Sequence, residues 1–168
     1  MIKKFKTLFF VKSSLISLYL ALTIPIPFIS IDQLKIISIF LFALGLYLII
    51  NITSDHVEIC DNKILYKTSF ITKVLGRKNW EIYWKDIRLI KSLPTSQGSK
   101  VYYFNTNKND NFLIPQRLEN FDKFLEIISQ KTGIAVNKIS HISPLWTYKL
   151  LTLLSVLMII GELFAFLI

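Results

Sequence analysis

Long apolar runs lie near both ends of the chain, and a patterned, charge-rich segment lies between them. Residues 13–31 and 36–54 carry no charged side chain, and residues 150–168 carry only Glu162. A helix needs about 20 predominantly apolar residues to cross the hydrocarbon core of a bilayer. The pattern therefore predicts three transmembrane helices, and the short link at 32–35 makes the first two a helical hairpin.

The first apolar run contains Pro25 and Pro27 near its far end, where lost backbone hydrogen bonds cost least because the helix is about to stop or kink. A cleavable signal peptide is the alternative for residues 1–30, since "MIKKFK" gives a basic start before an apolar core. The length of the run and the lack of a small-x-small cleavage pattern favour a retained span.

Lysines gather before the first and third apolar runs, whereas the hairpin link carries Lys35 alone. Cytoplasmic segments of membrane proteins are enriched in Lys and Arg. We therefore expect the N-terminus and the central segment in the cytoplasm and the C-terminus on the opposite side. The lysines that support this orientation are Lys3, Lys4, Lys6, Lys12, Lys131, Lys138 and Lys149.

The middle of the chain, residues 55–141, is the predicted soluble domain, between a transmembrane hairpin at 1–54 and a C-terminal transmembrane helix at 142–168. Its apolar residues recur with period 2, which is typical of half-buried strands. In "NWEIYW", for example, Trp80 and Trp84 share one face. Six strands are predicted, in "HVEIC", "ILYKTSF", "NWEIYW", "DIRLIKSL", "KVYYFNT" and "NFLIP".

One amphipathic helix is predicted at the end of this domain, in "RLENFDKFLEIISQKTG", because its apolar residues fall on one face at 3.6 residues per turn. Gly133 follows and can adopt the left-handed conformation that ends helices. The pattern predicts an α+β membrane protein, with a small antiparallel sheet capped by one helix. Its expected structural core includes Trp80, Trp84, Ile87, Phe121 and Leu125.

Several short motifs carry a resemblance: "WKDIRLI" at 84–90, a Gly-containing loop, a Tyr/Phe-rich strand, "LIP", and "LENFDKFLEIISQKTGI". Together they resemble the bacterial PH-like domains of membrane-tethered proteins. The resemblance implies a seven-stranded barrel or sandwich plugged by a C-terminal helix, with "ITKV" at 71–74 as part of a further strand. A looser likeness is to the photosystem I assembly factor family, which has two N-terminal spans and no C-terminal one. These likenesses imply a bacterial plasma membrane or a thylakoid.

The formal charge of +9 suits an anionic partner, although cytoplasmic positive charge in a membrane protein accounts for most of it. Cys60 is the only cysteine, so no intramolecular disulfide forms. His56 and His141 lack metal-ligand spacing, and structural or surface roles are expected for both.

Catalytic signatures are missing from the sequence: it contains no Gly-rich phosphate loop, nucleophile elbow, His-x-x-x-His pair or cysteine cluster. Glu81 and Asp86 are expected on the surface. We therefore expect no enzyme activity, cofactor or metal. An ionisable residue within a bilayer segment, here Glu162, is by default a functional-site hypothesis, and the alternative is that it reaches water near the opposite interface.

The connector "TKVLGRK" places Lys73, Arg77 and Lys78 around a glycine, with Lys67 nearby. PH-like folds that bind phosphorylated lipid headgroups carry cations in this loop, whereas exposed cytoplasmic cations are also ordinary. Nucleic-acid binding is not expected, because the aromatic residues at 102–104 alternate as strand residues do.

Two functions therefore follow from the sequence. The first is a non-catalytic scaffold or assembly factor that contacts membrane lipids and another membrane protein. The alternative is a sensor of anionic lipid headgroups that acts through the basic loop 73–78. A weaker third possibility is a small transporter component that uses Glu162.

Overall fold

The computed structural model describes residues 2–167, which form two compact units. Residues 2–8 and 54–143 form what we call the sheet unit, and residues 9–53 and 144–167 form the helical unit. The protein is therefore α+β, with antiparallel strands in one unit and long apolar helices in the other.

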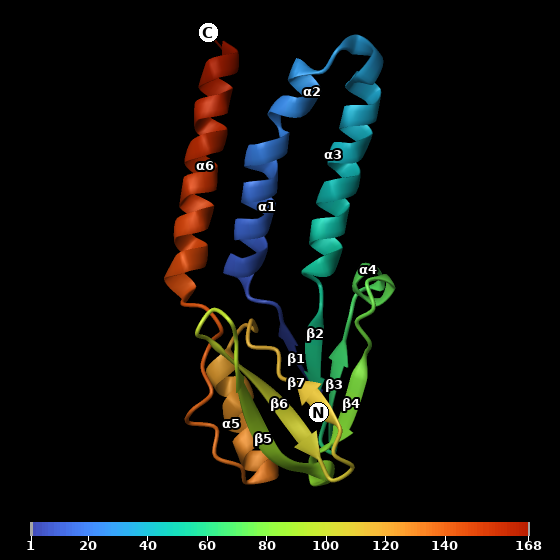
Figure 1. Ribbon diagram of the computed structural model, residues 1–168, viewed down its shortest axis with the longest axis vertical. Coiled ribbons are helices and arrows are strands. Elements are labelled where there is room, and N and C mark those ends of the chain that lie inside the picture. Colours follow the sequence, from blue (N-terminus) through green and yellow to red (C-terminus); the bar gives the residue numbers. More distant parts are fainter. Residues whose placement is uncertain (1, 168) are drawn as a thin grey trace. The chain divides into compact units, whose positions relative to one another are not determined.

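The sheet unit holds two antiparallel sheets and three short or medium helices (Figure 1). The four-stranded sheet has the spatial order β1 (Lys3–Lys6), β2 (His56–Ile59), β3 (Lys63–Lys67), β4 (Trp80–Tyr83). The three-stranded sheet has the order β5 (Ile87–Pro94), β6 (Lys100–Thr106), β7 (Asn111–Leu113). The helices are α4 (Phe70–Val74), a 3₁₀ helix (Trp84–Asp86) and α5 (Phe121–Thr132).

Strand β1 precedes the soluble segment predicted at 55–141. The prediction placed residues 2–8 in the transmembrane hairpin, whereas the structure groups them with the sheet unit. It pairs with β2, so that Phe5 lies opposite Val57, and both side chains are buried. The sequence "KKFK" has one apolar residue among lysines, which gives no readable alternation. Its strand conformation depends on a partner that lies about fifty residues later in the chain.

The resemblance implied that residues 71–74 are part of a strand. They lie instead in helix α4. Ser69 caps this helix, since its side chain accepts a hydrogen bond from the backbone N–H of Thr72 at 3.3 Å. Serine is a favoured N-cap residue because its oxygen satisfies a free N–H of the first turn. The seventh strand in the described residues is thus β1.

The chain passes from the first sheet to the second at the 3₁₀ helix, at the boundary between the strands predicted in "NWEIYW" and "DIRLIKSL". Trp84 fixes this corner, because its indole Nε1–H donates to the carbonyl of Cys60 at 3.1 Å and its backbone N–H donates to Asn62. Among the described residues no ladder joins β4 to β5 or β1 to β7, so the sheets do not close into a barrel. The barrel form of the predicted fold is therefore wrong, and two separate sheets replace it.

One hydrophobic core joins both sheets and α5. Phe104 from β6 and Phe124 from α5 are fully buried in it. Trp84, Ile87, Phe121 and Leu125 are buried in the same core, and Trp80 is partly buried against it. Helix α5 is shorter than the 117–133 segment predicted for it, and Gly133 ends it in the left-handed conformation with φ of 71°.

The helical unit contains α1 (Phe9–Thr23), α2 (Pro25–Ile29), α3 (Asp32–Ile52) and α6 (Leu145–Leu167). The segments Phe9–Ile29, Asp32–Ile52 and Leu145–Phe166 are long and apolar enough to cross a membrane, which confirms three apolar helices of spanning length. The first segment breaks between α1 and α2, because Pro25 cannot donate a backbone hydrogen bond and its ring crowds the preceding turn. Helices α1 and α6 lie side by side within the unit (Figure 1).

Small side chains occupy the helix contacts of this unit. Ser14 and Ala21 on α1 and Ser155 on α6 are buried. On α3, a Cβ atom at Gly45 would overlap the hydroxyl of Tyr19, which donates to the carbonyl of Phe42 at 2.8 Å. Close approach of helix backbones through small residues is typical of membrane helices.

Candidate functional site

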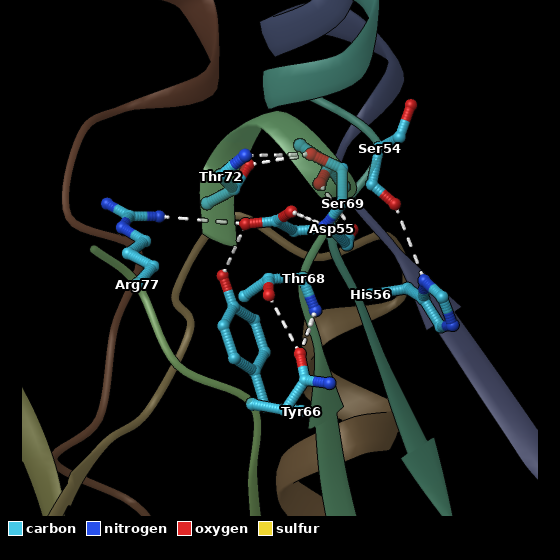
Figure 2. A network of polar contacts seen from close by, with 10 residues as sticks. Ser54, Asp55, His56, Tyr66, Thr68, Ser69, Thr72 and Arg77 are labelled. Carbon is cyan, nitrogen blue, oxygen red and sulfur yellow. Dashed lines mark hydrogen bonds and ion pairs between the residues drawn. The ribbon is translucent and has the colours of Figure 1, made fainter. Parts of the chain in front are cut away.

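Asp55 is a buried acid at the start of the first sheet, and it organises the polar contacts around the basic connector (Figure 2). Its Oδ1 accepts the backbone N–H of Ser69 at 2.8 Å, and its Oδ2 accepts the hydroxyl of Tyr66 at 2.9 Å. The Nη1 of Arg77 lies 3.8 Å from the same Oδ2. Buried carboxylates need such partners because desolvation of an unpaired charge is costly.

Tyr66 serves this network as a donor over the whole physiological pH range. Burial, followed by the neighbouring Asp55 carboxylate, raises the pKa of the Tyr66 hydroxyl to about 12. The phenol therefore keeps its proton and can hold the carboxylate. This geometry fixes the connector to β2 and β3, and it gives Asp55 a structural role.

A second contact closes the base of the connector. The Oδ1 of Asn79 accepts both the backbone N–H of Thr68 at 2.8 Å and the Thr68 hydroxyl at 2.7 Å. We call residues 68–79 the connector loop. Its two ends are thus joined by hydrogen bonds, and α4 forms its first part.

The four cations predicted to bind a headgroup divide into two pairs. Lys67 lies 2.6 Å from Glu58, and this hydrogen bond is the main cause of the lowered pKa of Glu58. Arg77 faces Asp55 as described above. Lys73 and Lys78 are exposed and have no ion pair within residues 2–167. The structure therefore leaves two of the four cations free for an external anion.

The tip of the connector loop is unexpectedly apolar. Phe70, Val74 and Leu75 are 72%, 70% and 67% exposed. The sequence predicts a basic loop and part of a further strand here, so these exposed apolar side chains were not expected. The signal that was available is Ser69 followed by an apolar i, i+4 pair, which indicates a capped helical turn.

A second exposed apolar surface lies on the three-stranded sheet. In the strand register, Leu93 lies opposite Val101. Tyr103 lies opposite both Lys91 and Leu113. Residues that lie opposite each other share a face of the sheet. Leu93 is 53% and Leu113 is 43% exposed. We call this surface the outer sheet face, and its apolar members are Leu89, Leu93, Val101, Tyr103 and Leu113.

The remaining candidate residues lie apart from these surfaces in the sequence. Glu162 lies on α6, and its Oε2 is buried without a hydrogen-bond partner in the described part of the chain. His56 contacts Glu58 at 3.3 Å, and Nδ1 of His141 lies 2.9 Å from the carbonyl of Gln116. Within residues 2–167 no group of three His, Cys, Asp or Glu side chains is arranged to hold a metal ion.

Comparison with known proteins gives one informative relative. The chain is 29% identical over 154 residues to an uncharacterized protein of Synechocystis sp., a match that covers 88% of this chain and 77% of that protein. No family model matches the chain. The chain is thus similar to a cyanobacterial protein over both its helical and its sheet-forming segments.

Proposed function

We propose that this protein is an integral membrane protein that holds a PH-like interaction domain at the cytoplasmic membrane surface. There it acts as a non-catalytic scaffold or assembly factor for another membrane protein. The observation that carries the proposal is the outer sheet face, where Leu89, Leu93 and Leu113 are exposed on one side of the three-stranded sheet.

The pairing of β1 with β2 supports the proposed topology. β1 precedes α1, and β2 follows α3, so the two apolar spans lie between strands that belong to one sheet. A chain that crosses a bilayer twice returns to its starting side. The N-terminus and the sheet unit then share one side, and α6, as a third span, leads to the opposite side. The lysine distribution argues that the shared side is cytoplasmic.

The arrangement of strands supports a PH-like domain. Four strands in one antiparallel sheet are followed by three in another and then by α5, whose apolar face lies in the common core. The bacterial PH-like family is expected to have seven strands and a C-terminal helix in this order. The separation of the two sheets at the Trp84–Asp86 corner is the point at which this chain departs from a closed barrel.

Contact with a protein partner is the role that best fits the outer sheet face. Contiguous exposed apolar side chains mark interaction surfaces in soluble domains, and the apolar members of this face surround the exposed Lys91. Leu89, Leu93 and Leu113 share this face with Tyr103, and aromatic residues are enriched at interfaces.

The test is purification of the full-length protein from its native membrane in a mild detergent. A recurrent stoichiometric partner is expected, and Leu93→Asp should lower its recovery at least about tenfold because a charge enters an apolar contact. Asn107→Asp is the matched control, since it adds the same charge at an exposed turn residue. Repeated recovery of a lone polypeptide, or equal loss with both variants, would contradict the scaffold function.

A second candidate function is favoured by the unpaired cations Lys73 and Lys78. Juxtamembrane cations attract the anionic lipids of the cytoplasmic leaflet. In this form the protein contacts anionic headgroups through the basic loop 73–78.

A further inference from the structure

The connector loop combines cations and exposed apolar side chains at one tip. Between Thr68 and Asn79 it carries three cations, Lys73, Arg77 and Lys78, and no acidic residue. Phe70 and Val74 are one helical turn apart in α4, and Leu75 follows directly. A basic segment without acids is complementary to an anionic surface, and large apolar side chains exposed to water are unfavourable without a covering partner.

The base of this loop is firmly held, so the exposed tip is a fixed feature of the fold. Ser69 is bound through its backbone N–H to Asp55, and Thr68 is bound twice to Asn79. Within α4, Thr72 is buried and contacts the Ser69 hydroxyl at 2.8 Å. The inward side of the helix is therefore occupied by polar contacts, and Phe70 and Val74 point to solvent.

The base of the loop is close in the chain to residues where two apolar helices begin and end. Asp55 comes three residues after Ile52, where α3 ends, and three residues of extended chain span at most about 10 Å. The carbonyl of Asp55 also accepts the hydroxyl of Thr7 at 2.9 Å, two residues before α1 begins. If α1 and α3 cross a bilayer, the base of the loop lies near its surface.

We infer that the connector loop docks on an anionic lipid surface by inserting Phe70, Val74 and Leu75 among the headgroups and acyl-chain ends. Lys73 and Lys78, the two cations without an ion pair in the described residues, then contact lipid phosphates, while their aliphatic stems extend along the interface. The inference rests on the membrane anchoring in the proposed function. It extends the second candidate function, lipid binding: the loop inserts into the membrane interface as an anchor and does not hold a headgroup in a pocket. The apolar tip supplies depth, and the cations supply selectivity for anionic lipid.

The test uses the full-length chain in lipid nanodiscs, with Cys60→Ser as background and an environment-sensitive fluorophore on Val74→Cys. Nanodiscs of phosphatidylcholine alone are compared with nanodiscs that also contain phosphatidylglycerol, each with a nitroxide-labelled lipid as quencher. We expect a blue-shifted emission and about twofold or greater extra quenching in the anionic discs. The matched control label is on Leu93→Cys, an exposed apolar position outside the loop that should stay unquenched.

The cations are tested by Lys73→Gln and Lys78→Gln combined, which should remove the extra quenching at position 74. Both side chains are exposed and lie in no ion pair of the described residues, so the fold should be retained, and circular dichroism checks this. Equal quenching in neutral and anionic discs, or a label at position 74 as water-exposed as that at position 93, would overturn the inference. The inference would also be overturned if the label at position 74 were shielded from water only when a second protein co-purifies with the chain.

Failure of the two proposals can be told apart. The double glutamine variant should still recover the protein partner, because the outer sheet face is unchanged. Loss of lipid quenching with the partner retained counts against the anchor alone. Lipid quenching without any partner counts against the scaffold alone.

Discussion

The sheet unit and the helical unit use the same apolar residue types in opposite ways. In the sheet unit the largest apolar side chains, such as Phe104 and Phe124, are fully buried. Among the described residues of the helical unit, no buried side chain is larger than that of Val11, whereas Phe40 is 65% exposed. The surroundings of each unit, and not hydrophobicity by itself, therefore decide which side chains lie inside.

The physical reason is the solvent that each surface meets. Water drives large apolar side chains together, because burial removes their area from contact with it. Lipid chains are as apolar as leucine, so helices in a bilayer gain little by burying large side chains and associate through close packing and hydrogen bonds. The exposed residues of the helical unit thus fit a lipid-facing surface.

The connector loop is one part of the sheet unit that, like the helical unit, exposes large apolar side chains. Phe70, Val74 and Leu75 point outward, while Thr72 and the Asp55 contacts fill the inner side. This exposed apolar tip motivates the inferred lipid anchor.

The largest expected difference between the units comes from deleting one phenyl ring in each. Phe124→Ala should lower the free energy of unfolding of the sheet unit by about 3–5 kcal/mol, since it leaves a cavity in a closed core. Phe40→Ala should change the stability by less than about 0.5 kcal/mol, because its ring contacts lipid or detergent. Urea denaturation in mild detergent, followed by tryptophan fluorescence for Phe124→Ala and by helical circular dichroism for Phe40→Ala, measures both. Similar losses for the two variants would remove the contrast.

A smaller effect is expected from filling a close helix contact. Gly45→Leu should destabilise the α1–α3 pair by about 1–3 kcal/mol, because the new side chain overlaps Tyr19 and separates the helices. Gly161→Leu is the control, since a Cβ atom there meets no other atom within 4 Å. Thermal loss of helicity in detergent compares the variants. An equal melting temperature for both would show that α1 and α3 do not pack through this glycine.

The smallest expected effect concerns charge pairing, which the sheet unit uses at its water-facing surface. The hydrogen bond from Lys67, together with His56, lowers the pKa of Glu58 below its ordinary value of 4.5. A depressed carboxyl pKa adds stability above that ordinary value, and this stability is lost as the pH falls through the folded pKa. Lys67→Met should therefore cost up to about 1 kcal/mol near neutral pH, a modest amount because Lys67 is half exposed.

That cost should shrink as the pH falls from 4.5 through the lowered pKa of Glu58, because the carboxyl then becomes protonated in the folded state and no longer needs its partner. Lys78→Met is the control, because Lys78 is exposed and lies in no ion pair of the described residues. Urea midpoints measured between pH 7 and pH 3.5 compare the two variants. A cost for Lys67→Met that stays constant over this range would mean that the Glu58 pair contributes nothing to stability.

Several elements could be predicted because their signals are local. The three apolar runs, the period-2 strands of the middle segment and the apolar face of α5 are each written in a few neighbouring residues. Gly133 was expected to end α5 for the same reason. Less of the candidate site could be predicted from the sequence. Lys67 and Arg77 were predicted as binding cations, but their pairing with the acids Glu58 and Asp55 was not predicted.

Length and periodicity act over one element at a time, and they were enough to predict the α+β class, the three apolar segments and the core face of strands such as β2 and β4. The tertiary structure was needed to show that Lys3–Lys6 joins the sheet, that the chain changes sheets at Trp84, and that Asp55 holds a helical loop with an apolar tip. Each of these depends on hydrogen bonds between residues far apart in the chain. Such bonds form only when the core has brought their partners together.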